Sequence, residues 1–352
     1  MSYHHFEPCS SQVTRRVYES QTKFQDVDLN AVVAEAFAGT EDKFTQTYAV
    51  RPLQVYNSQD CRGYRQGCGT VVNLLVQFVN AAGVKTMGVI LVDVAKGKPV
   101  PTMDGDLVYS FFEKFGTTEV TDDVTKIQYV DASVLVDQWH ENGVNRFTTK
   151  DGTTVLAITA RNRGECIIIK DPWTYSSKMG ADVIMQRFGS PPDNDGGYYA
   201  FGLAADDPTF PWLNVHSSFY TANTKTSKLK GSETLTLFLN VVAGGELPDA
   251  EFAHVVEFEL ELEPHGFTKN SKQKEKKQPG YVTAVCGFAT PVYGGARVIA
   301  DGIYVVASGV AGSFFEILDL KGHFADYTYP TEEGKIPPSI FDPFVFKTVG
   351  KH

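Results

Sequence analysis

The alternation of apolar and acidic residues near position 260 is the clearest pattern in the chain. Within 254–264, four apolar residues at even positions alternate with Glu257, Glu259, Glu261 and Glu263. Period-two alternation is typical of a strand with one buried and one solvated face, although Glu is a poor strand residue. Pro264 cannot donate a ladder hydrogen bond, so the strand should end before it. We therefore expect a strand over 254–263 with its carboxylates in water.

Apolar runs that end in turn signals predict further strands. The strongest lie at 70–80 and 85–93, and Asp151-Gly152 between 146–150 and 153–161 is typical of a hairpin. About eight strands with regular turns favour a sandwich or jelly roll. Other strands are predicted at 166–170, 197–204, 234–242, 281–288, 296–308 and 313–320.

Two short segments show helical spacing instead. The first covers 30–38, with Asn30 as its expected N-cap and Gly39 as its stop. The second covers 107–115, with Asp106 as its expected cap and Gly116 at its end. Residues 131–140 fit a helix or a strand equally well.

Composition agrees with an all-β chain and restricts the kinds of molecule that it is expected to bind. The chain has 352 residues with 31 Gly, 24 Phe and 16 Tyr, a balance that favours short strands joined by loops. A net charge of −10 argues against a surface that grips nucleic acid throughout, but it permits one basic patch. The five scattered cysteines indicate free thiols in a reducing compartment. We find neither a signal peptide nor a membrane span, so a soluble, cytosolic protein is expected.

Charge and composition divide the chain into four expected parts. Residues 1–44 form an N-terminal arm, 45–264 the main β-body, and 281–352 a small β-rich unit. Between the last two lies a linker, 265–280, in which only Glu275 opposes five lysines. Its composition is typical of a solvated tether, and contact with a polyanion is the alternative. The lysines are Lys269, Lys272, Lys274, Lys276 and Lys277.

Catalytic signatures are missing from the sequence. We find no phosphate-binding glycine loop, zinc-protease helix or nucleophile elbow, so we expect no enzyme and no catalytic residue. An enzyme on a β-sandwich would need a carboxylate pair or metal triad that the sequence does not display. A carbohydrate-binding or other ligand-binding sandwich is the other alternative, and packing is the simpler interpretation of its aromatic candidates. These candidates are Trp173, Tyr198, Tyr199 and Trp212.

Two segments resemble a known family. Residues 87–115 read M-G-V-I-L-V-D-V-A-K-G-K-P-V-P-T-M-D-G-D-L-V-Y-S-F-F-E-K-F, a strand ending in Asp, a P-x-P loop and a short helix. Residues 233–241 read E-T-L-T-L-F-L-N-V and precede the alternating strand. Both are similar to the shell domain in coat proteins of small icosahedral positive-strand RNA viruses, the tombusviruses and sobemoviruses. In size the chain also resembles the coats of dinoflagellate-infecting RNA viruses (alvernaviruses).

The resemblance implies a structural protein of the virion. It implies an eight-stranded jelly-roll shell over 45–264, with a short inserted helix and with 281–352 as a protrusion or inter-subunit unit. Many copies would self-assemble in the host cytoplasm into an icosahedral shell around genomic RNA, without a membrane. Outer loops would meet a host-cell receptor for attachment. The candidate host-facing residues are Asp193, Asp195, Asp206 and Asp207.

Two departures from the family bear on RNA and calcium. Residues 1–44 hold four basic and seven acidic residues, a net of −3, whereas the coats it resembles commonly open with a basic arm. The family also often binds calcium between subunits through two Asp residues. Here Asp93 is present, Lys98 stands near the second position, and Asp104 and Asp106 are alternative ligands whose repulsion without metal would loosen the shell. Besides the linker lysines, polyamines or divalent ions, the candidates for RNA contact are Arg15, Arg16, Lys23, Lys225, Lys228 and Lys230.

Overall fold

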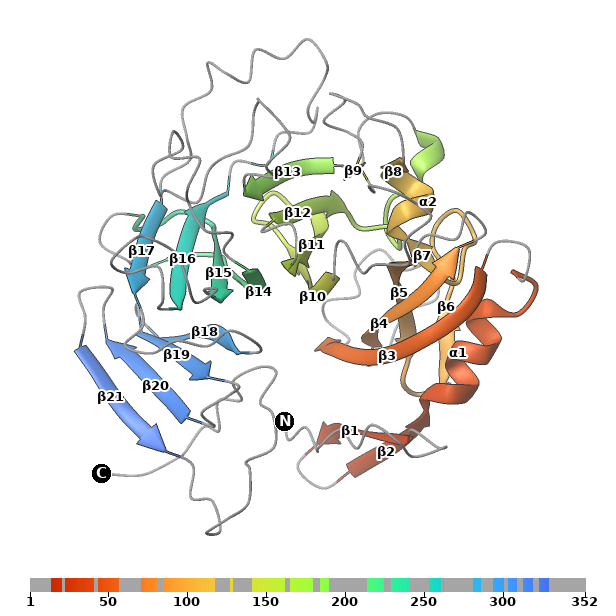
Figure 1. Cartoon of the computed structure of the whole chain (residues 1–352), viewed down its shortest axis with the longest axis horizontal. Coiled ribbons are helices and arrows are strands. Elements are labelled where there is room, and N and C mark those ends of the chain that lie inside the picture. The colour runs from red at the N-terminus through yellow and green to blue at the C-terminus, as the bar shows by residue number, and fades with distance from the viewer. Residues whose placement is uncertain are drawn as a thin grey trace. The chain divides into compact units, whose positions relative to one another are not determined.

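The computed structural model confirms the expected all-β class. Strands dominate it, only two α-helices occur among the described residues, and the ladders are antiparallel apart from one short pair. Two compact units divide these elements: β1 to β13 belong to one and β14 to β21 to the other (Figure 1). The structure describes residues 14–20, 23–40, 44–56, 71–80, 85–117, 127–128, 141–161, 165–179, 184–189, 214–224, 229–240, 253–260, 262, 281–285, 294–300, 303–308, 313–318 and 323–328.

The first unit is built on a central sheet whose two faces are both covered. Its order is β3-β4-β5-β6, and β7 also pairs with β5. Successive side chains on β4 point to opposite faces, so Leu74 and Leu75, both fully buried, belong to two different cores. The predicted strands at 70–80 and 85–93 are confirmed almost to the residue. The bounds are β3 (Phe44–Tyr56), β4 (Val71–Asn80), β5 (Lys85–Asp93), β6 (Lys98–Val100) and β7 (Tyr109–Ser110).

Helix α1 (Leu29–Phe37) covers one face of this sheet. It follows a hairpin of β1 (Thr14–Ser20) and β2 (Lys23–Asp28). The predicted N-cap, Asn30, is wrong: Asp28 Oδ1 accepts hydrogen bonds from the backbone N–H of Asn30 at 3.0 Å and of Ala31 at 3.1 Å. The predicted stop is confirmed, because Gly39 has a φ of 74° that favours glycine. Part of the segment expected to be an arm therefore packs on the body.

A second sheet covers the other face of the central sheet. Its order is β10-β11-β12-β13, and its apolar residues share one core with β4, β5 and α2 (Phe111–Phe115). The predicted Asp151-Gly152 hairpin is confirmed, with a φ of 89° at Gly152. The remaining bounds of this unit are β8 (Gly116–Thr117), β9 (Ile127–Gln128), β10 (Glu141–Thr148), β11 (Thr154–Ala160), β12 (Glu165–Lys170), the 3₁₀ helix η3 (Ser177–Met179) and β13 (Ile184–Gly189).

The second predicted helix is shorter than expected, and its cap is different. Backbone N–H of Thr102 donates to the carbonyl of Asp106 at 2.8 Å, so Asp106 closes a turn instead of starting a helix. The helix begins after Ser110, whose Oγ accepts from the backbone N–H of Glu113 at 3.3 Å. Gly116 ends it as predicted. Neither described helix is long and apolar enough to cross a membrane.

The second unit also contains two packed sheets. The first has the order β14-β15-β16-β17 and the second β18-β19-β20-β21, and Val255 and Tyr304 meet in the core between them. Strand β17 pairs with β16, so a strand beyond the expected linker completes the sheet before it. The bounds are β14 (Asn214–Thr221), β15 (Thr234–Asn240), β16 (His254–Glu259), β17 (Tyr281–Val285), β18 (Gly295–Ala300), β19 (Ile303–Ser308), β20 (Ser313–Leu318) and β21 (His323–Thr328).

The prediction that the glutamates of β16 face water is wrong at Glu257. This side chain is 0% exposed, as are Val255 and Val256, so both faces of the strand are buried. The physical reason is the second sheet: Val255 and Glu257 point to the face that β18 and β19 cover, where the hydroxyl of Tyr304 donates to Glu257 Oε2. The strand also ends earlier than predicted, at Glu259.

The sheets follow the order of the chain. Within each described four-stranded sheet, hydrogen-bonded neighbours are consecutive strands, which makes each sheet an up-and-down meander. Two meanders face each other in each unit, an arrangement typical of a β-sandwich. A jelly roll contains Greek keys, in which a fourth strand returns beside the first. The predicted strand at 197–204 and the ambiguous segment 131–140 lie outside the described residues.

Candidate functional site

Asp93 closes the turn between β5 and β6. Its Oδ1 accepts from the backbone N–H of Lys96 at 3.1 Å, and its Oδ2 lies 2.9 Å from Lys96 Nζ. The carbonyl of Asp93 accepts from the backbone N–H of Gly97 at 2.9 Å. These contacts make Asp93 the cap of a tight hairpin, with a lysine of the same turn beside its carboxylate.

The loop that follows β6 is fixed to the segment after β12. Backbone N–H of Met103 donates to the carbonyl of Pro172 at 2.9 Å, and Trp173 Nε1 donates to the carbonyl of Val100 at 2.9 Å. Asp104 accepts hydrogen bonds from the Ser176 hydroxyl and from the hydroxyl and backbone N–H of Ser177. Side chains about 70 residues apart in sequence are thus brought together around Asp104.

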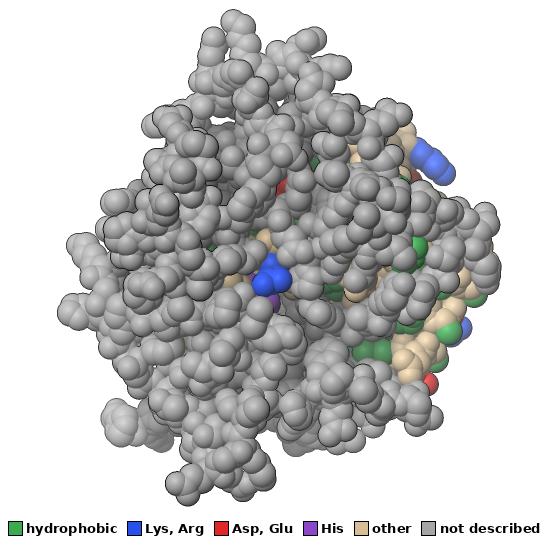
Figure 2. Space-filling model, in the orientation of Figure 1, with side chains coloured by type: hydrophobic (Ala, Val, Ile, Leu, Met, Phe, Trp, Pro, Cys, Tyr) green, Lys and Arg blue, Asp and Glu red, His purple; other side chains and the backbone are tan. Residues whose placement is uncertain are grey.

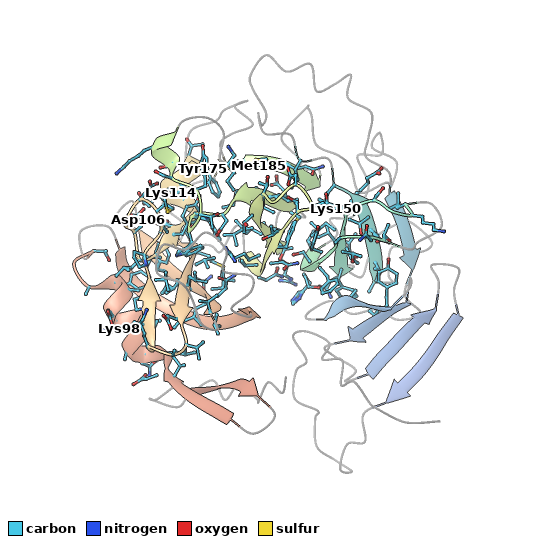
Figure 3. All side chains as sticks on the ribbon, turned by 180° about the vertical axis from the view of Figure 1, so that it is seen from behind. Lys98, Asp106, Lys114, Lys150, Tyr175 and Met185 are labelled. Atoms are coloured by element: carbon cyan, nitrogen blue, oxygen red, sulfur yellow. The ribbon has the colours of Figure 1, made fainter. Side chains whose placement is uncertain are left out.

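Lys114 reaches this loop from α2. Its Nζ lies 2.7 Å from Asp106 Oδ2 and 5.8 Å from the centre of the Tyr109 ring. Phe111 and Phe115 hold the helix in the core, so the ammonium group is carried on an anchored element. Figure 3 shows Asp106 and Lys114 together at the edge of the first unit, with Tyr175 nearby.

These groups line a small surface hollow, which we call the Lys114 hollow. On its opposite side, Lys170 Nζ lies 4.2 Å from the centre of the Tyr175 ring, a cation–π contact. Its lining residues carry two ammonium groups, one carboxylate, two phenols and two aliphatic hydroxyls. The lining residues are Thr102, Asp104, Tyr109, Lys114, Lys170, Pro172, Tyr175 and Ser177.

The surroundings of this hollow shift the pKa values of Asp104 and Tyr109. Burial opposes the ionisation of Asp104, but hydrogen bonds from Ser176 and Ser177 and the charge of Lys114 outweigh it, so the pKa lies below 3.8. For Tyr109, burial is the main cause of a raised pKa, and the charges of Asp104 and Asp106 add to it. At neutral pH the site therefore holds an ionised Asp104 and a neutral Tyr109.

The lowered pKa of Asp104 predicts a pH dependence of stability. A carboxyl group with a lower pKa in the folded state stabilises the fold above its unfolded value, near 3.8, and loses this effect as pH falls through its folded value. We expect urea unfolding to show the largest difference between wild type and Asp104→Asn at neutral pH and a smaller one on acidification. A difference that does not change with pH would contradict this role of Asp104.

The candidate calcium ligands have partners within the chain. Asp104 and Asp106 lie in one loop. Asp104 accepts hydrogen bonds from serine hydroxyls and an amide N–H, and Asp106 forms an ion pair with Lys114. Asp93 is engaged by Lys96 in a separate turn. Calcium takes six to eight oxygen ligands, and no group of three acidic, histidine or cysteine side chains gathers among the described residues. The structure thus pairs these carboxylates with protein cations and donors.

The structure describes four of the RNA-contact candidates, Arg15, Arg16, Lys23 and Lys230. Arg15 and Arg16 lie on β1 and Lys23 on β2, and Arg16 is opposite Asp26 in the ladder. Lys230 is exposed in the turn between β14 and β15. Figure 2 marks in blue the few Lys and Arg side chains of described residues that are visible on the drawn face. Lys225, Lys228 and the linker lysines are outside the described residues.

The remaining surface candidates lie largely outside the described part of the chain. This holds for Asp193, Asp195, Asp206 and Asp207, and for the aromatic residues Tyr198, Tyr199 and Trp212. Trp173 is described, and it cannot belong to a sugar platform because it is only 1% exposed and packs near Tyr109. Packing is therefore the correct interpretation of this tryptophan.

Two buried polar clusters were missed by sequence reasoning. In the first unit, Arg146 Nη2 lies 2.8 Å from Asp171 Oδ2, and their side chains are 1% and 0% exposed. In the second, Glu257 accepts from Thr234 Oγ1 at 2.7 Å and from Tyr304. Cys166, the one described cysteine, is buried and free, and burial raises the pKa of its thiol. Residue spacing gives no signal for either cluster, because their members come from different strands.

Comparison with known proteins provides no family for this chain. No protein-family model matches it, and no curated protein matches it at a significant level.

Proposed function

We propose that the chain is the coat protein of a small non-enveloped RNA virus and self-assembles into a closed icosahedral shell. The observation that carries the proposal is the order of elements over 85–117. Strand β5 ends at Asp93, the short strand β6 contains Pro99, Pro101 follows it, and β7 leads into the short helix α2. In the resembling segment of viral coats, a strand that ends in Asp, a P-x-P segment and a short helix follow one another in this order. The second resembling segment supplies β15 and β16, which pair as neighbours.

A large all-β body supports a structural role. Both units consist of packed antiparallel sheets with extensive apolar cores. Rigid sandwiches of this kind present their loops at the surface, where copies can meet under closed symmetry. Apolar patches at such contacts would drive association, and charged rims would set its response to salt and pH. Loops on the outer side would bind the host-cell receptor.

The jelly-roll topology is the finer part of the proposal. It requires strand pairs between segments that are distant in the chain, whereas the described sheets pair consecutive strands apart from the short pair of β5 and β7. The proposal therefore depends on the order of the elements and on the all-β body. A density map of assembled particles, traced through each sheet, would test the jelly roll.

We expect copies of the chain to assemble into closed particles. The full chain, purified and viewed by electron microscopy after light scattering, should form uniform closed spheres under at least some conditions of pH and salt. Added RNA should promote the spheres and become protected from nuclease. A chain that stays monomeric across pH and ionic strength, with and without RNA, would overturn the proposal. Glycan binding by such a monomer would establish the sugar-binding alternative in its place.

A further inference from the structure

We infer that the segment 170–178 binds the phosphate groups of single-stranded RNA. This inference rests on the proposed function, because a shell around RNA must neutralise phosphate charge, whereas residues 1–44 hold only four basic residues against seven acidic ones. The segment would supply positive charge in place of a basic arm. RNA binding and assembly are measured separately, so a failure of one can be told from a failure of the other.

The two lysines at the ends of this segment have ammonium groups that no carboxylate neutralises. Lys96, Lys98 and Lys114 each form an ion pair with an aspartate or a glutamate. Where the structure describes the chain, Lys170 and Lys178 form no such pair. Their positive charge is therefore left to attract an anion outside the subunit.

Lys170, the last residue of β12, lies against an aromatic ring. Its Nζ is 4.2 Å from the centre of the Tyr175 ring, and both residues are half-buried. A cation–π contact restricts where the ammonium group can lie, but it leaves the charge in place. The two residues also line the Lys114 hollow together with Ser177. A phosphate that reaches this surface would meet a cation and a hydroxyl group.

The chain before Lys178 is held in place by hydrogen bonds. Backbone N–H of Ser177 donates to Asp104 Oδ2 at 3.0 Å, and backbone N–H of Lys178 donates to Ser176 Oγ at 3.2 Å. A segment that is already ordered loses less entropy when a ligand binds. Lysines beside an aromatic side chain are typical of surfaces that bind single-stranded nucleic acid.

The acidic groups of the neighbouring loop are engaged within the subunit. Asp106 pairs with Lys114 at 2.7 Å, and Asp104 accepts hydrogen bonds from the serines of the segment. Asp104 is half-buried, whereas Ser177 and Lys178 are exposed. The ammonium group of Lys178 is therefore more accessible to a phosphate than the carboxylate is.

Removal of both charges should weaken RNA binding. For Lys170→Met with Lys178→Met, we expect the affinity for a short fluorescent oligouridine to fall by roughly 25-fold at about 0.1 M salt. The reason is that each neutralised phosphate contributes about 0.7 to the slope of log affinity against log salt, which is about 5-fold for each lysine at this salt concentration. The slope itself should become shallower by about 1.4. Fluorescence anisotropy of the full chain, at concentrations where light scattering shows no assembly, measures both quantities.

Two matched variants control for the loss of net charge and for folding. Lys96→Met with Lys98→Met removes the same number of charges, but these lysines already pair with carboxylates of the chain, so the affinity should fall far less. Lys170→Arg with Lys178→Arg keeps both charges and should bind at least as tightly as the wild type. The thermal midpoint of each variant shows whether it is folded. If the double Met variant does not fold, the exposed Lys178→Met alone should still weaken binding by about 5-fold.

Several outcomes would overturn the inference. One is a wild-type chain that forms shells but does not bind the oligouridine, a result that would leave the coat function standing. Another is an equal loss of affinity in the two double Met variants, since net charge alone would then explain it. A third is poly-glutamate that displaces the RNA as well as unlabelled oligouridine does, because the lysines would then suit an acidic protein partner. The expected loss of binding in a chain that never assembles would support the RNA site and contradict the coat function.

Discussion

Replacing Arg146 by Met should lower the free energy of unfolding of the first unit by about 3–5 kcal/mol, the usual cost of removing one partner from a buried ion pair. Arg146 Nη2 lies 2.8 Å from Asp171 Oδ2, and neither side chain has more than 1% exposure. The hydroxyl of Thr174 also donates to Asp171 Oδ2, at 2.9 Å. Without Arg146, this carboxylate would remain in an apolar core with a single neutral donor on that oxygen. The loss is measured by urea unfolding monitored through Trp173.

A double variant separates the charge from the packing. In Arg146→Met with Asp171→Leu the buried carboxylate is gone, so most of the lost stability should return. Lys98→Met is the control for an exposed pair and should cost less than about 1 kcal/mol. A cost of that small size for Arg146→Met, or a double variant as unstable as the single one, would mean that this ion pair does not hold β10 to the end of β12.

Strands whose pattern is set locally could be predicted from the sequence. The limits of β4 and β5 follow from uninterrupted apolar runs with turn residues at their ends. The hairpin between β10 and β11 follows from Asp151-Gly152, because only a flexible residue adopts its positive φ with ease. Such signals lie within the segment itself and do not depend on residues elsewhere in the chain.

Burial by a distant element could not be predicted. The alternation at β16 is a real period-two pattern, but it does not tell whether a second sheet will cover the acidic face. Glu257 is buried because β18 and β19 cover it, and Tyr304 of β19, 47 residues later in the chain, donates to it. The predicted helix caps were wrong for a related reason. Asp106 closes a turn with Thr102, and Ser110 caps the helix instead.

The contacts of the candidate site could not be predicted from the sequence for the same reason. Resemblance to viral coats directed attention to Asp104 and Asp106. Their partners come from elsewhere: Lys114 lies eight residues after Asp106, and Ser176 lies 72 residues after Asp104. Carboxylates in one loop are possible metal ligands, whereas only the three-dimensional arrangement shows that Asp106 pairs with Lys114 and that Asp104 accepts hydrogen bonds from Ser176 and Ser177.

The second large effect is expected at the buried Glu257. In Tyr304→Phe, Oε2 of Glu257 loses the donor that the second sheet provides, and the apolar contacts of the ring are kept. Loss of a partner for a buried acceptor costs about 1–3 kcal/mol. We therefore expect a lower midpoint of urea unfolding for the second unit with an unchanged slope, since the surface exposed on unfolding is the same.

The chain offers a matched control for this substitution. The hydroxyl of Tyr220 also donates to a glutamate, Glu233 Oε1, but Tyr220 is only half-buried. Water can replace the lost donor there, so Tyr220→Phe should cost clearly less than Tyr304→Phe. Equal costs at both sites would mean that Glu257 finds solvent or another donor, and that the bond across the two sheets does not hold them together. A larger cost at Tyr304 would instead show that the hydrogen bond between Tyr304 and Glu257 stabilises the packing of the two sheets.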